Sequence, residues 1–188
     1  MRKDKSNGPD RRNLLHNRER AGKLLVTAVS CVFLGILYQM IFCLSAQDAE
    51  ESGSLSRTIS IKCVESVNFL AGGRWKEDEV LGLAEIIERP VRKLAHFSEY
   101  GVMGIAVYVL LSQWMKRGWG LRLLTTAWVF VSAAGDEFHQ YFVPGRYASA
   151  ADVALDTCGG ICGMLFCICA AALYRKHGRA RAVGNHAP

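Results

Sequence analysis

Apolar residues gather in four long stretches of this chain, at residues 24–46, 94–115, 121–140 and 153–174. Charged and imidazole side chains are nearly excluded: the first stretch has none, and the second carries only His96 and Glu99 near its start. A helix rises about 1.5 Å per residue, so roughly 20 apolar residues cross a hydrocarbon core about 30 Å thick. The pattern therefore predicts four transmembrane helices.

Residues 47–92 show a different pattern, in which apolar positions repeat every three or four residues. We predict two amphipathic helices, at residues 56–70 and 77–89, separated by Ala71-Gly72-Gly73 and ended by Pro90. The residues expected to face inward are Ile59, Cys63, Val67 and Leu70, then Val80, Leu81, Ala84 and Ile87. This segment is expected to lie on the outer membrane surface or to cap the mouth of the bundle.

The predicted fold is an all-α membrane protein: a four-transmembrane-helix bundle with an outer amphipathic helical segment between its first two spans. We divide the chain into an N-terminal segment (residues 1–23), a membrane domain (24–174) and a tail (175–188). Gly159 and Gly163 lie about one helical turn apart, as do Gly101 and Gly104, and small residues at this spacing favour close packing of spans.

The net charge of +6 is unevenly distributed along the chain. Residues 1–23, 116–122 and 175–188 hold 15 of the 23 basic residues but only three of the 17 acidic residues. Basic flanks stay on the cytoplasmic side, so we predict a cell-membrane protein with both termini and the 116–122 loop inside. The basic ends are expected to contact anionic membrane lipids, and a nucleic-acid partner is not expected.

The seven cysteines predict no disulfide framework. Six lie in the predicted spans, where cysteine packs as a small hydrophobic residue, and Cys63 is left without an obvious partner. The histidines nearest the acidic residues, His96 and His139, belong to different helices and lack the spacing of zinc ligands. We expect no metal and no cofactor.

Polar residues of three predicted spans fall at a similar depth. Counting about 20 residues outward from the cytoplasmic ends of these spans reaches His96, Gln140 and Leu155. Carboxylates inside a membrane are costly unless paired or hydrated, so they should face the interior of the bundle. The sequence therefore predicts a polar pocket near the outer face. Its candidate residues are Lys93, His96, Glu99, Tyr100, Asp136, Glu137, His139, Gln140, Arg146, Asp152 and Asp156.

Local spacing around the last connection supports this pocket. Ser149 and Asp152 have the spacing of a capping box at the start of the fourth span. Pro144-Gly145-Arg146 predicts a tight turn that holds the Arg146 guanidinium over the carboxylates.

Five short motifs lie near the predicted outer ends of the spans, in a region that we call the polar layer. They are Leu44-Ser45-Ala46-Gln47, Lys93-Leu94-Ala95-His96-Phe97-Ser98-Glu99-Tyr100, Gly135-Asp136-Glu137-Phe138-His139-Gln140, Phe142-Val143-Pro144-Gly145-Arg146 and Asp152-Val153. In this order they resemble the VanZ-like family, over residues 26–174. The resemblance implies four membrane spans and work at the cell envelope, since the founding member is associated with glycopeptide antibiotic resistance. Asp156 departs from the family pattern, in which Asn is more frequent there.

Three functions stay open on this evidence. The pocket can bind or modulate a cell-envelope component, such as a cell-wall precursor or a lipid-linked anion, and so affect glycopeptide susceptibility. Alternatively, the protein is a membrane-embedded hydrolase or transferase in which His96, Asp136 and Glu137 do acid–base work and the other candidates bind substrate. In the third reading, the polar layer only fixes the register of the helices.

Overall fold

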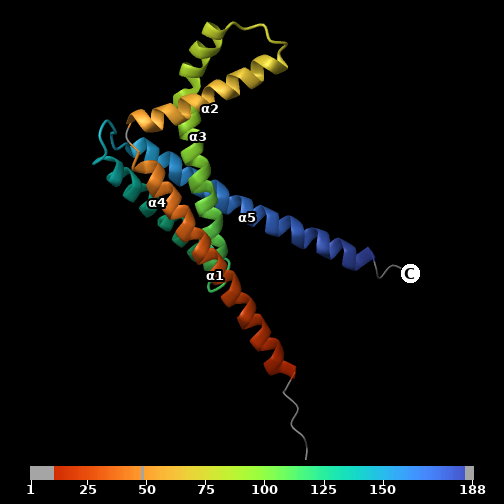
Figure 1. Cartoon of the computed structure of the whole chain (residues 1–188). Helices are drawn as coiled ribbons and strands as arrows, with labels where there is room; N and C mark the ends of the chain where they lie inside the picture. Colours follow the sequence, from red (N-terminus) through yellow and green to blue (C-terminus); the bar gives the residue numbers. More distant parts are fainter. Residues whose placement is uncertain (1–10, 48, 185–188) are drawn as a thin grey trace, which may run out of the picture.

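The structure is a computed structural model that describes residues 11–47 and 49–184, with side chains for residues 11–47 and 52–177 (Figure 1). Five helices follow one another along the chain, and the described residues contain no strand. The helices are α1 (Arg11–Ser45), α2 (Ala49–Leu70), α3 (Glu77–Ser112), α4 (Trp119–Gln140) and α5 (Ala150–Gly184). The predicted all-α class is therefore confirmed.

Three described helices are long and apolar enough to cross a membrane, rather than the four that we predicted. They are α1, α3 and α5, the last over Ala150–His177. The expectation of a span at residues 121–140 was wrong. In α4, Arg122 lies near one end and Asp136 near the other, so the uncharged part between them rises only about 20 Å. That rise falls short of a hydrocarbon core about 30 Å thick.

Helix α4 runs beside α3 and brings the chain back to the level at which α1 ends (Figure 1). Its buried face repeats every four residues through Leu121, Thr125, Val129 and Ala133. At the end of α4, the Nε2 of Gln140 donates a hydrogen bond to the Ser45 Oγ across 3.4 Å. The ends of α1 and α4 and the start of α5 consequently meet at one end of the bundle.

Helix α3 continues through Pro90, although we predicted one helix ending there and a new span starting at residue 94. A proline inside a helix removes one hydrogen bond and costs about 3 kcal/mol. Packing on both sides of Pro90 offsets this cost. Val80 and Ala84 are buried before it, and Tyr100 and Met103 are almost fully buried after it. Each large buried apolar side chain contributes about 1.5–3 kcal/mol, so a few of them outweigh the lost bond.

Helix α2 and the first half of α3 form a hairpin that projects from the bundle (Figure 1). The turn is as predicted: α2 ends at Leu70, and Gly72 and Gly73 have φ values of 93° and 67°. The inward face of α2 was predicted wrongly. Ser56, Ser60 and Val64 are buried, because two small serines allow α3 to approach closely.

The apolar residues that we expected inside this hairpin are divided between its two sides. Val80 and Ala84 are buried and Ile87 packs against them, as predicted. The exposed members of the predicted set are Ile59, Cys63, Val67, Leu70 and Leu81.

Helices α3 and α5 make the most extensive contact in the bundle, through the glycines identified in the sequence. A Cβ atom at Gly163 would collide with the backbone of Gly101, and one at Gly104 would collide with the backbone of Gly160. The predicted close packing of the spans at these glycines is confirmed. A second buried cluster joins Leu34 and Leu37 of α1 to α3 and α4.

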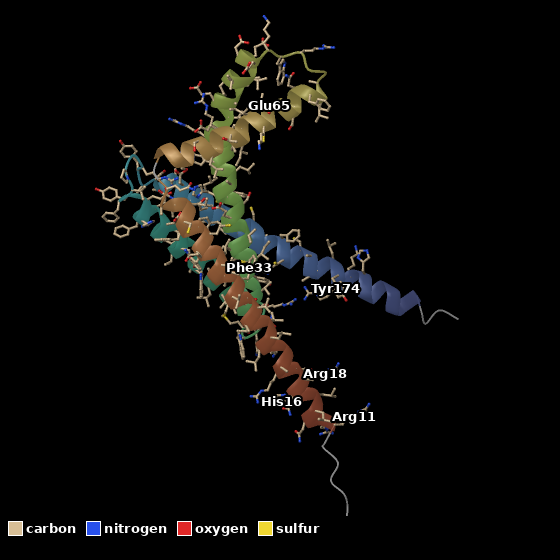
Figure 2. The ribbon with its side chains drawn as sticks, in the orientation of Figure 1. Arg11, His16, Arg18, Phe33, Glu65 and Tyr174 are labelled. Carbon is tan, nitrogen blue, oxygen red and sulfur yellow. The ribbon has the colours of Figure 1, made fainter. Side chains whose placement is uncertain are left out.

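The first and last helices extend beyond the predicted spans. Helix α1 begins at Arg11, and Arg11, His16 and Arg18 lie at its far end, away from the hairpin (Figure 2). Helix α5 continues to Gly184, past the predicted end of the last span at residue 174. Residues 1–10 of the N-terminal segment and 185–188 of the tail lie outside the described residues. The division into a membrane domain and two basic ends stays a prediction.

Candidate functional site

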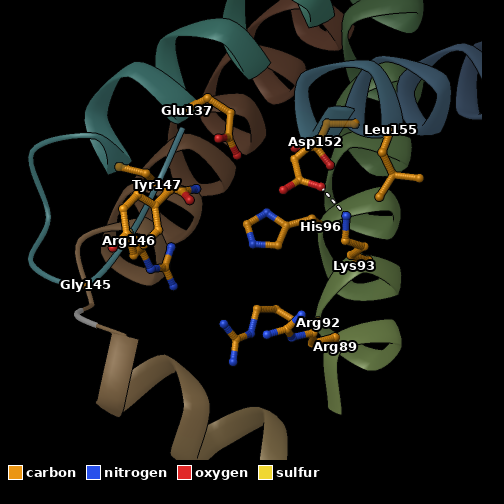
Figure 3. A pocket seen from close by; sticks show the side chains of 12 residues that line it. Arg89, Arg92, Lys93, His96, Glu137, Gly145, Arg146, Tyr147, Asp152 and Leu155 are labelled. Atoms are coloured by element: carbon orange, nitrogen blue, oxygen red, sulfur yellow. Dashed lines mark hydrogen bonds and ion pairs between the residues drawn. The ribbon is translucent and has the colours of Figure 1, made fainter. Parts of the chain in front are cut away.

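A cavity of about 330 Å³ lies where the end of α4 and the start of α5 approach the middle of α3 (Figure 3). Seven of the eleven residues predicted for the polar pocket line it. They are Lys93, His96, Glu137, Gln140, Arg146, Asp152 and Asp156. Three helices and one loop thus contribute polar side chains to one space.

One face of α3 supplies four of the lining side chains, namely those of Arg89, Arg92, Lys93 and His96. Residues spaced by three, four or seven positions share a helical face, so the uninterrupted α3 aligns them. The Nη2 of Arg92 donates to the Glu88 Oε1 at 3.0 Å and to the Ser56 Oγ at 3.1 Å. Arg92 therefore links α3 to α2 while it lines the cavity.

An ion pair joins α3 to α5 at the edge of the cavity. The Lys93 Nζ lies 2.6 Å from the Asp152 Oδ1. The side chain of Lys93 is 55% exposed and that of Asp152 is 33% exposed. Water screens a pair at this exposure, so it contributes at most about 1 kcal/mol to stability.

Glu137 fixes the start of α5. Its Oε2 accepts a 2.7 Å hydrogen bond from the backbone N–H of Ser149, the residue that precedes the helix. The Ser149 Oγ in turn accepts a 3.3 Å bond from the N–H of Asp152. Only half of the predicted capping box is present, because Glu137 takes the place expected for the Asp152 carboxylate. Burial raises the pKa of the Glu137 carboxyl, and the bond from Ser149 partly opposes that rise.

The loop between α4 and α5 turns as predicted. The N–H of Arg146 bonds to the carbonyl of Val143 at 3.2 Å, and Gly145 between them has a φ of 75°. Proline followed by glycine with positive φ is typical of a type II turn. This turn brings the half-buried side chain of Arg146 to the cavity.

Three polar atoms in the cavity wall are buried and have no hydrogen-bond partner among the described residues. They are the Arg92 Nε, the His96 Nδ1 and the Asp156 Oδ1. Most buried polar groups in proteins have a partner, and leaving one without costs about 1–3 kcal/mol. Unmet hydrogen-bonding capacity is thus concentrated where the cavity lies.

Charge is unevenly distributed around the cavity. Figure 3 shows Arg89, Arg92 and Arg146 on one side of His96, whereas Glu137 lies on the other side. Asp152 lies beside Lys93, its ion-pair partner. The side formed by the three arginines, which we call the basic wall, is suited to an anionic group. Guanidinium groups bind phosphate or carboxylate through paired N–H donors.

Four predicted site residues line no part of this cavity. Glu99 lines a smaller neighbouring cavity, and Tyr100 is buried in the bundle with its hydroxyl 3.4 Å from the Ser132 carbonyl. Asp136 accepts a 3.1 Å hydrogen bond from the Nε2 of Gln140. The ring of His139 stacks on that of Phe42, with centroids 4.7 Å apart. These contacts hold α3 and α4 in place beside the cavity.

Two of the cationic side chains in the cavity wall, those of Arg89 and Arg92, were not predicted from the sequence. The sequence feature that could have identified them is the spacing of Arg89, Arg92, Lys93 and His96. These four residues share one helical face only if the helix continues through Pro90. Tyr147 and Leu155 also line the cavity without having been identified.

Within the described residues there is no cluster of three or more His, Cys, Asp or Glu side chains arranged to hold a metal ion. The seven cysteines are all unpaired thiols.

Comparison with known proteins gives one match. A family model described as VanZ/LLP1 matches residues 30–172, a stretch that contains α2, α3 and α4 entirely and every lining residue of the cavity. Neither the search of curated proteins nor the search of solved structures gave a match.

Proposed function

This chain belongs to the VanZ/LLP1 family, and on that premise we propose that it is a membrane protein that binds an anionic group of a cell-envelope component. The binding site is the cavity described above, with the basic wall as its anion-binding side. A cell-wall precursor or a lipid-linked anion carries a group of this kind. Binding of such a component would affect susceptibility to glycopeptide antibiotics.

One observation carries the proposal: the basic wall holds a buried donor, the Arg92 Nε, that has no partner among the described residues. A guanidinium has five N–H donors, and the two hydrogen bonds of Arg92 described above use only its Nη2. An anionic oxygen in the cavity would accept a charge-assisted hydrogen bond from the donors of this guanidinium that the protein leaves unused.

The distribution of charge supports an orientation in the cell membrane with the cavity outside and both termini in the cytoplasm. Basic residues flank the ends of α1 and α5 that lie away from the cavity. The three candidate spans alone would leave the two ends on opposite sides, so this orientation also requires α4 to carry the chain back. The course of α4 beside α3 and its return to the level of Ser45 support that role, although its uncharged part is shorter than a full span. Positively charged flanks are retained in the cytoplasm.

The proposal is tested by titrating the detergent-solubilised protein with glycerol 3-phosphate, a soluble phosphate monoester, and following its melting temperature. Arg146→Gln should weaken binding about tenfold, which corresponds to about 1.4 kcal/mol. Arg57→Gln is the matched control, because Arg57 is an exposed cation on α2 that lines no described cavity. Equal affinities of wild type and Arg146→Gln would contradict the proposal.

A specific observation also favours a second candidate, a membrane-embedded hydrolase. His96 lines the cavity, and its buried Nδ1 has no described partner, so the imidazole can serve as the base that accepts a proton from an attacking water. Glu137 lines the same cavity but is engaged by Ser149, and Asp136 lines none of the described cavities. His96→Gln should then abolish release of phosphate from a bound ester while the protein still binds glycerol 3-phosphate. Full phosphate release by His96→Gln would reject this role for His96.

A further inference from the structure

A second, smaller cavity of about 80 Å³ adjoins the first and shares three residues with it: Arg92, His96 and Arg146. Its remaining walls are more apolar than those of the first cavity. They include Leu44 at the end of α1 and Leu55 and Ile59 of α2. The polar cavity therefore continues toward a side where hydrocarbon predominates.

A groove of about 330 Å³ follows between α1 and α3, and it shares Glu99 with the second cavity. Phe33, Ile36 and Met40 of α1 line it, together with Val102 of α3. Glu99 is the only acidic or basic residue in this lining, and it lies at the junction with the second cavity.

The α1 side chains of the second cavity and the groove form one continuous stripe. Leu44, Met40, Ile36 and Phe33 are spaced by three or four residues, so they lie on one face of the helix. From Leu44 to Phe33 the stripe rises about 16 Å. Figure 2 shows Phe33 on α1, farther from the hairpin than the end of α1 near the cavity.

The groove opens toward the space that lipid would occupy. Both α1 and α3 are candidate membrane spans. Ile36 is 64% exposed, Phe33 45% and Met40 44%, so these side chains form an accessible apolar surface. An occupant of the groove can therefore enter sideways from the bilayer without passing through water.

We infer that the ligand is an amphiphilic lipid, with its anionic head at the basic wall and one hydrocarbon chain in the groove between α1 and α3. This inference rests on the proposed function and specifies its ligand class. Its physical basis is the order of the three spaces, which runs from cationic through mixed to apolar. That order matches a molecule with a charged head and an apolar chain. A soluble anion would leave the groove unused.

The energetic contributions of the two parts differ. Lipid chains in the bilayer are as apolar as the groove, so moving a chain between them gains little from the hydrophobic effect. The head supplies most of the affinity, whereas the groove positions the chain and selects molecules that have one. Blocking the groove should consequently weaken binding of a lipid and leave binding of a soluble head group intact.

The experiment uses the full chain in detergent and three probes. They are glycerol 3-phosphate, phosphatidic acid (the same head with two chains) and diacylglycerol (the chains without phosphate). The concentration of each probe that gives half of its maximal effect on melting temperature is measured for wild type, Ile36→Trp and Met40→Trp. Leu165→Trp is the control, since Leu165 is an exposed apolar residue of α5 that lines none of these three spaces.

Ile36→Trp and Met40→Trp should each raise the half-maximal concentration of phosphatidic acid about tenfold relative to Leu165→Trp. Neither should change that of glycerol 3-phosphate, and diacylglycerol should have no effect. Comparison with Leu165→Trp cancels the partitioning of the lipid into micelles, and the melting temperatures without probe establish that each variant is folded.

Two results would overturn the inference and leave the proposed function intact. One is unchanged binding of phosphatidic acid by both groove variants, while Arg146→Gln still weakens binding of glycerol 3-phosphate. The other is an equal effect of diacylglycerol and phosphatidic acid, which would show that the phosphate is not recognised in the lipid. If Arg146→Gln leaves binding of both phosphate probes unchanged, the proposed function fails and the inference fails with it.

Discussion

The two sides of the cavity hold their charged groups in different ways. On the α4–α5 side, Glu137 is 6% exposed and bonded to Ser149, so its carboxylate ties two helices together. On the basic wall, Arg89 is exposed and Arg146 is half-buried, and Arg92 keeps a buried Nε without a described partner. The comparison indicates that the buried acid maintains the frame, whereas we propose that the cations provide the binding surface. Under that proposal, a single layer of charged residues contains both structural and ligand-binding groups.

The largest effect should follow from removing two cations of the basic wall together. Arg92→Gln combined with Arg146→Gln should lower the affinity for glycerol 3-phosphate about 100-fold, because hydrogen bonds to charged groups each contribute about 1.5–3 kcal/mol. Titration calorimetry in detergent measures this change. High salt should weaken binding by the wild type more than binding by the double variant, because the variant has fewer charged contacts for salt to screen. A change of less than threefold would place the anion elsewhere.

The next effect concerns stability on the opposite side. Glu137→Ala removes the acceptor for the Ser149 N–H and should lower the free energy of unfolding by about 2 kcal/mol. Glu137→Gln is the control: it keeps an acceptor oxygen and should lose less. Unfolding in mixed micelles measures both variants. The structural role of Glu137 would be contradicted if Glu137→Ala had the same free energy of unfolding as wild type but no longer bound glycerol 3-phosphate.

The smallest effect should come from the exposed pair between the two sides. Asp152→Asn should lower the free energy of unfolding by less than about 1 kcal/mol, because water screens the bond to Lys93. The Asp152 N–H still reaches Ser149, so the start of α5 is kept. The same unfolding assay in low and high salt checks this, and a loss above 2 kcal/mol would mean that the pair is a main structural link.

The depth of polar residues predicted much of the candidate site. It put His96, Glu137 and Asp156 at one level on three helices, and the structure places all three around one cavity. The turn at Pro144 and Gly145, which carries Arg146, was predictable from local chemistry. These features depend on spacing along a helix or within four residues, so the sequence alone contains them.

Features that depend on packing between helices were not predictable in the same way. Pro90 lies inside α3 because buried side chains on both sides offset its cost, and no local signal expresses that balance. The buried face of α2 is centred on Ser56 and Ser60 because their small side chains let α3 approach. Apolar periodicity selected the opposite, exposed face instead. The carboxylate that accepts a hydrogen bond from the Ser149 N–H likewise belongs to another helix. It is that of Glu137 in α4, not that of Asp152.

The most direct test of the central claim is a structure of the full chain in a nanodisc that contains phosphatidic acid. We predict phosphate density at the basic wall, within hydrogen-bonding reach of Arg92 and Arg146, and continuous chain density along the α1 stripe from Leu44 toward Phe33. Phosphate density only at the basic ends of the chain, with the cavity free of lipid, would contradict it.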